Sequence, residues 1–377
     1  MSIPFHRRTR LDQEEAFIVK ALASDHLKGD GQFTKQCQAW LEQWVGCAKA
    51  LLTPSGTAAL ELACLLLDLR PGDEVILPSF TFSSCANAII LRGAVPVFVD
   101  VQAKDLNLAS DLLEQARSSR TRAVMPVHYG GVVCDMDRIM TFAKKYELAV
   151  IEDAAQAIGA TYKGQPAGSF GDGAAFSFHS TKNLTAGEGG AFVANRDDWA
   201  ARAVIVREKG TNRQQFLAGL VDKYTWVDQG SSFLPSELQS ALLHCQLEAC
   251  NDISAKMVAL WEYYHNSLEE LELQGFITRL KPDKCCQHNG HLYAVLLNDD
   301  VDRSKVIHAL RKQGVETTFH FVPLHSSPAG ERFGKTASDM TNTDRAGSQL
   351  LRLPIFYGMD FHEVDEVVEC FKKQLIS

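Results

Sequence analysis

Residues 74–100, EVILPSFTFSSCANAIILRGAVPVFVD, decide the fold class of this chain. The run Glu74–Leu77 predicts a short buried strand, Ser84–Arg92 has the spacing of a helix, and Val95–Asp100 predicts the next strand. Strand, helix and strand in this order form a β-α-β unit. Both strands lack polar alternation, so we expect a parallel sheet covered by helices on both faces.

The same alternation of helix and strand continues on both sides of this unit. Helical spacing is found in Ala58–Leu69 and Met136–Tyr146. Further strands are predicted at Ala123–Val127, Leu148–Asp153, Gly173–Phe178 and Gly190–Ala194. Ligands of open α/β sheets bind at the carboxyl ends of the strands, so polar residues at those ends are candidates for function.

The pattern changes near residue 250, where we place the boundary between a large domain, residues 1–250, and a small domain, residues 251–377. The large domain includes an N-terminal segment, residues 1–30. A long helix from about Leu247 to Leu271 is followed by predicted strands at Leu292–Leu297 and Glu316–Phe319 and by a closing helix at Val364–Leu375. The stretch Arg207–Pro235 is long and weakly periodic, and long ordered loops are usually functional.

The composition of the 377 residues is that of a globular protein, with 46% apolar and 22% charged residues. The net charge of −8 has the wrong sign for attraction to nucleic acid or to an anionic membrane, so neither is expected as a partner. The ten cysteines lie mostly alone in apolar segments, as in reduced cytosolic proteins. We find no export signal and no membrane span, and we expect a cytoplasmic protein.

The run Phe176–Asn183 carries the strongest chemical signal. Lys182 lies just beyond a predicted buried strand and is a candidate for a desolvated amine with a lowered pKa that forms a Schiff base. Asp153 ends another strand, where a carboxylate can keep a pyridine nitrogen protonated. Glu152 must face the opposite side of the sheet, because successive strand residues alternate. Two plain alternatives stay open: a surface lysine, and an aspartate that caps the following helix.

The run Ser55-Gly56-Thr57 opens a predicted helix with small residues, and the free N–H groups and dipole of a helix start suit an anion. Helix capping explains the same residues without any ligand. The chain has neither the GxGxxG pattern of dinucleotide folds nor the GxxxxGK[ST] pattern of P-loops.

Several histidines allow further chemistry. Cys285-Cys286-Gln287-His288 together with His291 fits no zinc spacing, and we expect no metal. Candidates for contact with a substrate are His179, His320 and His325. A histidine pair beside a proline, as in the last two, is more often a hydrogen-bonded structural feature.

Four blocks of sequence, taken together, carry a resemblance to a known family. They are Ser55–Thr57, Pro78–Phe82, Glu152–Gln156 and Ser177–Asn183. Their order and spacing resemble the pyridoxal phosphate-dependent nucleotide-sugar aminotransferases, and the resemblance covers nearly the whole chain. It implies an α/β fold of type I, with a mostly parallel seven-stranded sheet, helices on both faces and a smaller C-terminal α+β domain. It also implies a homodimer with shared active sites.

The resemblance assigns expected roles to single residues. The cofactor is expected to be pyridoxal 5'-phosphate, which passes through pyridoxamine 5'-phosphate. Lys182 matches the lysine that binds this cofactor, Asp153 the partner of the ring nitrogen, and Gln156 the donor to the phenolic oxygen. Phe82 matches the aromatic residue that stacks on the ring. The phosphate-binding residues are expected to be Ser55, Gly56, Thr57 and Ser177.

One expected phosphate contact comes from a neighbouring subunit. In the family an asparagine of a GYN segment usually makes it. The matching run in this chain reads Gly230-Ser231-Ser232-Phe233, so Ser232 is expected to replace that asparagine.

A closer resemblance, to the members that make dTDP-4-amino-4,6-dideoxygalactose, rests on Gly29–Gly31, Arg207–Arg213, Asp222–Trp226, Gly230–Ser232 and Leu350–Pro354. It implies transfer of the amino group of L-glutamate to C4 of dTDP-4-dehydro-6-deoxyglucose for a lipopolysaccharide or enterobacterial common antigen. Three alternatives stay open: the gluco epimer, a 3-aminotransferase acting on a 3-keto sugar, and a non-catalytic cofactor-binding regulator. A sugar 3-dehydratase is disfavoured, since it carries a histidine in place of Lys182.

Overall fold

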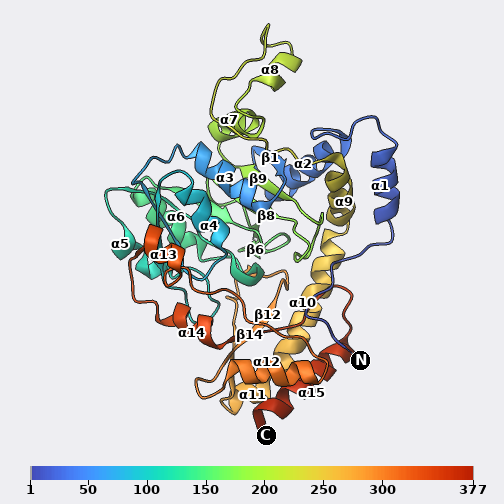
Figure 1. Ribbon diagram of the computed structural model, residues 1–377, viewed down its shortest axis with the longest axis vertical. Helices are drawn as coiled ribbons and strands as arrows, with labels where there is room; N and C mark the ends of the chain where they lie inside the picture. The colour runs from blue at the N-terminus through green and yellow to red at the C-terminus, as the bar shows by residue number, and fades with distance from the viewer. Residues whose placement is uncertain (1, 377) are drawn as a thin grey trace.

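A large sheet forms the centre of the molecule, of which the computed structural model describes residues 2–376 (Figure 1). Its eight strands follow the order β1-β9-β8-β5-β4-β2-β3-β13. All neighbours pair in parallel except β9, which is antiparallel to both β1 and β8. The strands are β1 Lys49–Thr53, β2 Glu74–Pro78, β3 Val95–Val99, β4 Thr121–Val124, β5 Ala149–Asp153, β8 Gly173–Ser177, β9 Gly190–Ala194 and β13 Lys335–Thr336.

Fifteen α-helices lie within the described residues. They are α1 Glu14–Leu22, α2 Gln32–Val45, α3 Gly56–Leu66, α4 Ser83–Ile90, α5 Leu113–Ala116, α6 Met136–Lys145, α7 Asp197–Arg207, α8 Arg213–Leu217, α9 Glu237–Glu248, α10 Cys250–Ser267, α11 Glu269–Leu273, α12 Arg303–Lys312, α13 Pro328–Phe333, α14 Thr341–Gln349 and α15 Phe361–Ile376.

Helices cover both faces of the large sheet, as predicted. On one face α3, α4 and α7 pack against a hydrophobic cluster that includes Val75 and Ile151. On the other face α2, α5 and α6 pack against a cluster that includes Ile76 and Val150. Because neighbouring strand residues point to opposite faces, strands covered on both sides are largely apolar. This explains why the unit β2-α4-β3 could be recognised from sequence.

The large sheet differs from the prediction at its two edges. The edge strand β1 was not among the predicted strands; it lies at the edge of the sheet and pairs with β9. At the other edge β13 returns from the C-terminal third of the chain and pairs with β3, so the sheet has eight strands rather than seven.

A second sheet lies in the C-terminal third, at the lower end of the molecule in Figure 1. It is antiparallel, in the order β10-β12-β14, and α10, α12 and α15 pack together beside it. A third, small sheet joins β11 to β6 and β7. The remaining strands are β6 Thr161–Tyr162, β7 Gln165–Pro166, β10 Ile277–Arg279, β11 Cys286–Gln287, β12 Tyr293–Leu297 and β14 Leu350–Leu353.

Two predictions in this C-terminal part were wrong in detail. The expected strand at Glu316–Phe319 is only an isolated bridge between Thr318 and Arg352. The expected long helix is interrupted at Ala249 and at Leu268, giving α9, α10 and α11. The domain boundary at residue 250 coincides with the break between α9 and α10 and stays a prediction.

The stretch Arg207–Pro235 is largely irregular and projects from the body of the molecule around α8, at the top of Figure 1. The ten cysteines are free thiols. Among residues 2–376, no helix combines the length and the apolar character needed to cross a membrane.

Candidate active site

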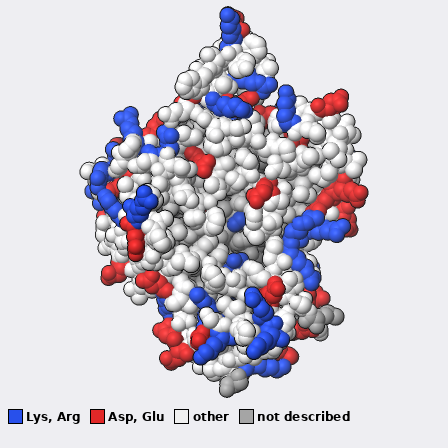
Figure 2. All heavy atoms as spheres, viewed as in Figure 1, with Lys and Arg blue, Asp and Glu red and all other residues white. Residues whose placement is uncertain are grey.

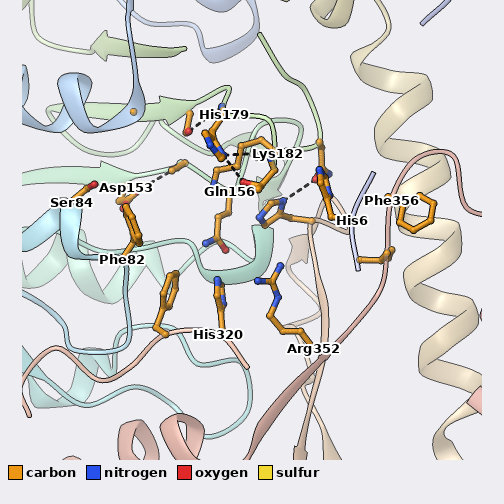
Figure 3. A pocket seen from close by; sticks show the side chains of 18 of the residues that line it. His6, Phe82, Ser84, Asp153, Gln156, His179, Lys182, His320, Arg352 and Phe356 are labelled. Atoms are coloured by element: carbon orange, nitrogen blue, oxygen red, sulfur yellow. Dashed lines mark hydrogen bonds between the residues drawn. The ribbon is translucent and has the colours of Figure 1, made fainter. Parts of the chain in front are cut away.

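A cavity of about 600 Å³ opens at the carboxyl ends of β2, β5 and β8. Figure 2 shows it as a hollow with basic side chains inside, and Figure 3 shows the side chains that line it. A volume of this size suits a small-molecule ligand. The sequence-predicted residues that line it are Ser55, Gly56, Thr57, Phe82, Asp153, Gln156, Ser177, His179, Lys182 and His320.

One end of the cavity is formed by the start of α3. Ser55 caps this helix, because its Oγ accepts the N–H of Ala58 at 3.1 Å. A Cβ on Gly56 would lie 2.9 Å from the Cβ of Ser177, so a larger residue could not bring α3 this close to β8. The N–H groups of Gly56 and Thr57 open the helix, where no preceding turn accepts them. This end therefore offers free donors to an anion.

Asp153 occupies the end of β5 and is held in place by two donors. The thiol of Cys85 donates to Oδ2 at 2.8 Å, and the N–H of Ala155 donates to Oδ1 at 3.0 Å. The side chain is only 6% exposed yet lines the cavity. Gln156 follows three residues later, and its Oε1 accepts the N–H of Gly130 at 2.7 Å. With that oxygen fixed, the amide nitrogen is the group that Gln156 can offer to a ligand.

Lys182 lies in a turn after β8, where its backbone N–H donates to the carbonyl of His179 at 2.9 Å. Burial lowers the pKa of the Lys182 amine to about 8, although the carboxylate of Asp153 acts in the opposite direction. An amine with this pKa is partly neutral near pH 7, as a nucleophile or proton carrier must be.

Aromatic rings border the cavity on the side of β2. Phe82 is 59% exposed and lies 6.4 Å, ring centre to ring centre, from Phe321. His320 stacks on Phe321 at 3.7 Å, and its Nδ1 is 2.8 Å from the hydroxyl of Tyr129. Burial lowers the pKa of His320 well below its usual value, so the ring is neutral. His179 lies near the rim, where its Nδ1 is 2.9 Å from the Thr181 hydroxyl.

Two sequence-predicted residues lie outside this cavity. The Nδ1 of His325 is 2.8 Å from the Ser79 hydroxyl, and its Nε2 is 3.4 Å from Asp344. Ser232 pairs with Glu208 and lines a separate surface depression. Within residues 2–376 no group of three or more histidine, cysteine or acidic residues is arranged to hold a metal ion.

The sequence matches a known protein family over nearly its whole length. The model of the DegT/DnrJ/EryC1/StrS aminotransferase family matches residues 10–372. The chain belongs to this family. The enzyme class that the four sequence blocks indicated is thus confirmed.

Relatives of this aminotransferase extend the comparison over nearly the whole chain. SpsC of Bacillus subtilis, a spore coat polysaccharide biosynthesis protein, is 36% identical over 349 residues, which are 90% of this chain and 88% of that protein. GDP-perosamine synthase of Caulobacter vibrioides is 32% identical over 370 residues, 97% of each chain.

Solved structures confirm the predicted fold class. Spr1654 of Streptococcus pneumoniae, described as a sugar aminotransferase, has a TM-score of 0.90 and 27% identity in its pyridoxal phosphate form. The match covers 99% of this chain and 98% of that one. A structure of the same protein in the pyridoxamine phosphate form superposes with the same TM-score.

Sequence reasoning missed several residues that line the cavity of this aminotransferase. The N-terminal arm, residues 5–9, crosses the cavity. His6 Nε2 lies 2.8 Å from the Ser180 carbonyl, and the Thr9 hydroxyl donates to the Asn183 carbonyl at 2.7 Å. No local pattern marks such an arm. Arg352 also lines the cavity. The sequence did contain a signal for Arg352, because this charged residue interrupts the otherwise apolar strand Leu350–Leu353.

Proposed function

We propose that this aminotransferase moves an amino group from L-glutamate to C4 of dTDP-4-dehydro-6-deoxy-D-glucose. The products are 2-oxoglutarate and dTDP-4-amino-4,6-dideoxy-D-galactose, a precursor of surface polysaccharide. The five stretches that carry the closer resemblance support this substrate, and the Bacillus subtilis relative named for polysaccharide biosynthesis supports the pathway class. The observation that carries the chemistry is that Lys182 and Asp153 line one cavity next to the free N–H groups of α3.

The residues of the cavity fit pyridoxal phosphate, the cofactor bound in the related Spr1654 structure. The N–H groups of Gly56 and Thr57 open α3 without an acceptor in a preceding turn and suit phosphate oxygens. Asp153 is suited to hold a proton on the ring nitrogen, Gln156 to donate to the phenolic oxygen, and Phe82 to stack on the ring. When bound, the cofactor supplies a carbon that exchanges the amino group and a ring that accepts the electron pair of the broken C–H bond.

Lys182 would hold the cofactor through its amine and would afterwards move the proton. With the cofactor bound, the neutral amine of Lys182 would take the proton from the α-carbon of the donor and, once protonated, would return it on the side of the cofactor. The same steps in reverse deliver the amine to the keto carbon of the sugar. Because the pKa of Lys182 is lowered to about 8, both the neutral and the protonated forms of its amine are populated at pH 7 to 8.

Two hydrogen bonds hold the orientation of the Asp153 carboxylate. Its two oxygens are fixed by the thiol of Cys85 and the N–H of Ala155, so the carboxylate does not turn away from the ring nitrogen. A fixed negative charge at this point favours the protonated ring, which is the better electron acceptor.

We propose that the enzyme is a homodimer with shared active sites. Ser232 lies in a depression apart from the cavity of its own chain, which supports a contact with the cofactor phosphate of a second copy. The projecting loop of the same region exposes large apolar side chains, Leu220 at 76% and Trp226 at 75%, as surfaces that contact another protein do.

Mixing two inactive variants tests the shared sites. Lys182→Ala lacks the amine, and Ser232→Trp blocks the contributed contact, so a mixed dimer regains one intact site. We expect the mixture to recover about a quarter of the wild-type activity. No recovery, or a monomer in sedimentation, would count against shared sites.

GDP is a second candidate for the nucleotide of the substrate, since the relative from Caulobacter vibrioides is named for a GDP-linked sugar. The deciding experiment incubates the purified enzyme and L-glutamate with 4-keto and 3-keto sugars linked to dTDP, UDP and GDP, and assigns the product by NMR. We expect the dTDP-linked 4-amino galacto product. A gluco, 3-amino or GDP-linked product would replace the proposed substrate. Bound cofactor without any turnover would identify a regulator.

A further inference from the structure

An arginine lies in the middle of an otherwise apolar strand at the wall of the cavity. Arg352 belongs to β14, whose three leucines are at most 1% exposed. Because strand residues alternate, Leu351 and Leu353 enter the core while Arg352 faces the other way. Figure 3 shows its guanidinium pointing into the cavity beside His320, from the side opposite Lys182.

The guanidinium has no anionic partner within residues 2–376. The backbone of Arg352 is fixed, since its N–H donates to the Thr318 carbonyl at 2.8 Å. Its Cζ lies 4.8 Å from the centre of the Phe5 ring. No ion pair joins Arg352 to a carboxylate, and its buried Nε has no hydrogen-bond partner. The guanidinium of Arg352 is therefore held in place without an anionic group of the described residues bound to it.

The side chains around this guanidinium do not compensate its charge. Burial lowers the pKa of three nearby imidazoles, and the charge of Arg352 lowers it further; these are His6, His291 and His320. Two carboxylates line the cavity. That of Asp153 is bound by Cys85 and Ala155, and that of Glu188 is 64% exposed and 3.6 Å from His179.

A buried cation without a counter-ion is costly, and a ligand anion removes that cost. We propose that Arg352 binds a carboxylate of the amino donor through its guanidinium fork, which matches a carboxylate in shape and charge. This inference rests on the proposed transamination and adds to it the residue that recognises the donor.

The position of Arg352 favours the donor over the other anions of the reaction. The cofactor phosphate fits the free N–H groups of Gly56 and Thr57. In a sugar nucleotide the diphosphate is attached to C1, across the ring from the reacting C4. In glutamate the α-carboxylate is bonded to the carbon whose proton Lys182 moves, so it must lie close to that amine. Lys182 and Arg352 face the same part of the cavity from opposite sides (Figure 3).

The test measures the two half-reactions separately in the holoenzyme. For Arg352→Gln we expect the affinity for L-glutamate, followed by the change of the cofactor spectrum in single turnovers, to fall about a hundredfold. The reaction of the pyridoxamine phosphate form with the sugar nucleotide should change by less than about threefold. As a probe that needs no turnover, binding of glutarate is titrated calorimetrically and should weaken by the same factor as that of glutamate.

Two further variants keep the result interpretable. Arg352→Lys retains the charge without the fork, and we expect it to lose only about tenfold in affinity for glutarate. Arg303→Gln is the matched control, because Arg303 also lies over a ring, that of Phe319, but donates to the carbonyls of Gly347 and Leu350 outside the cavity. It should bind glutarate like the wild type.

The outcomes separate this inference from the proposed function. Equal glutarate binding by wild type and Arg352→Gln overturns the inference alone. So does a variant that loses the reaction with the sugar nucleotide instead, which would assign Arg352 to the diphosphate. A wild type that binds glutarate but transaminates no keto sugar overturns the proposed function and leaves Arg352 as a carboxylate site. A wild type that binds neither glutarate nor glutamate overturns both.

Discussion

Glu152 and Asp153 are neighbours in β5, and their carboxylates serve opposite sides of the large sheet. Glu152 is fully buried, lies 2.9 Å from His128 Nε2, and accepts three backbone N–H groups at 2.7–2.8 Å from the loop that contains Gly168 and Gly171. Asp153 instead lines the cavity. The alternation of a strand thus separates a structural anchor from a candidate catalytic group.

This division predicts opposite effects of two matched substitutions. Glu152→Gln should lower the free energy of unfolding by about 3 kcal/mol, because it removes the charge that several buried donors share. Asp153→Asn should keep the melting temperature and lower turnover by on the order of 100-fold, because the ring nitrogen loses its charged partner. Thermal melts and turnover rates measured on both variants check this; an active Asp153→Asn enzyme contradicts the assignment.

The lowered pKa of Lys182 predicts how the apoenzyme reacts with pyridoxal phosphate. Only the neutral amine is a nucleophile, so the rate should rise with pH and level off above about pH 8. Asp153 raises this pKa, and Asp153→Asn should therefore move the midpoint to lower pH. The measurement is the growth of visible absorption after mixing between pH 6 and pH 10. A midpoint near the ordinary lysine value of about 10.4 would show that Lys182 is not desolvated.

Cys85 is expected to position Asp153. Cys85→Ala removes the donor to Oδ2 and should lower kcat/KM by about threefold to tenfold, whereas Cys85→Ser keeps a donor and should stay within about twofold. The pH titration of the bound cofactor band should shift in the alanine variant only. Equal titrations in both variants would reduce Cys85 to a packing role.

Replacing Arg352 by an apolar residue is expected to raise the stability of the enzyme and to weaken its binding of the amino donor. Arg352→Met replaces a buried unpaired charge by an apolar chain of similar length and should raise the free energy of unfolding by about 1 kcal/mol. The melting temperature should rise by about 2 °C while the affinity for glutamate falls. If the variant were less stable than the wild type, the arginine would have a structural role in β14.

Local patterns predicted the parts of the fold that local physics determines. The buried strands β2, β3 and β5 contain short runs of apolar residues, and such runs are visible directly in the sequence. The edge strand β13 has only two residues, both exposed, so nothing in its sequence distinguishes it from a loop. Its pairing with β3 depends on the tertiary structure, as does the loss of the expected strand at Glu316–Phe319.

The residues of the candidate site likewise divide into those with a local sequence pattern and those placed by long-range contacts. Ser55–Thr57, Asp153 and Lys182 stand at ends of strands or helices, where a sequence pattern marks them. His6 and Thr9 come from an arm that is folded over the cavity by contacts to residues some 174 positions away. His325 was expected at the substrate but contacts Ser79 and Asp344 instead. Such long-range contacts leave no local signal.

Lys182 is proposed to bind the cofactor through its side-chain amine, and every role assigned to the cavity depends on this bond. The most direct measurement reduces the holoenzyme with borohydride, which fixes the cofactor on the nitrogen that holds it, and maps the label by peptide mass spectrometry. We expect the label on the peptide that contains Lys182 and none in Lys182→Ala. A label on another lysine, or full multiple-turnover activity of Lys182→Ala, would contradict the claim.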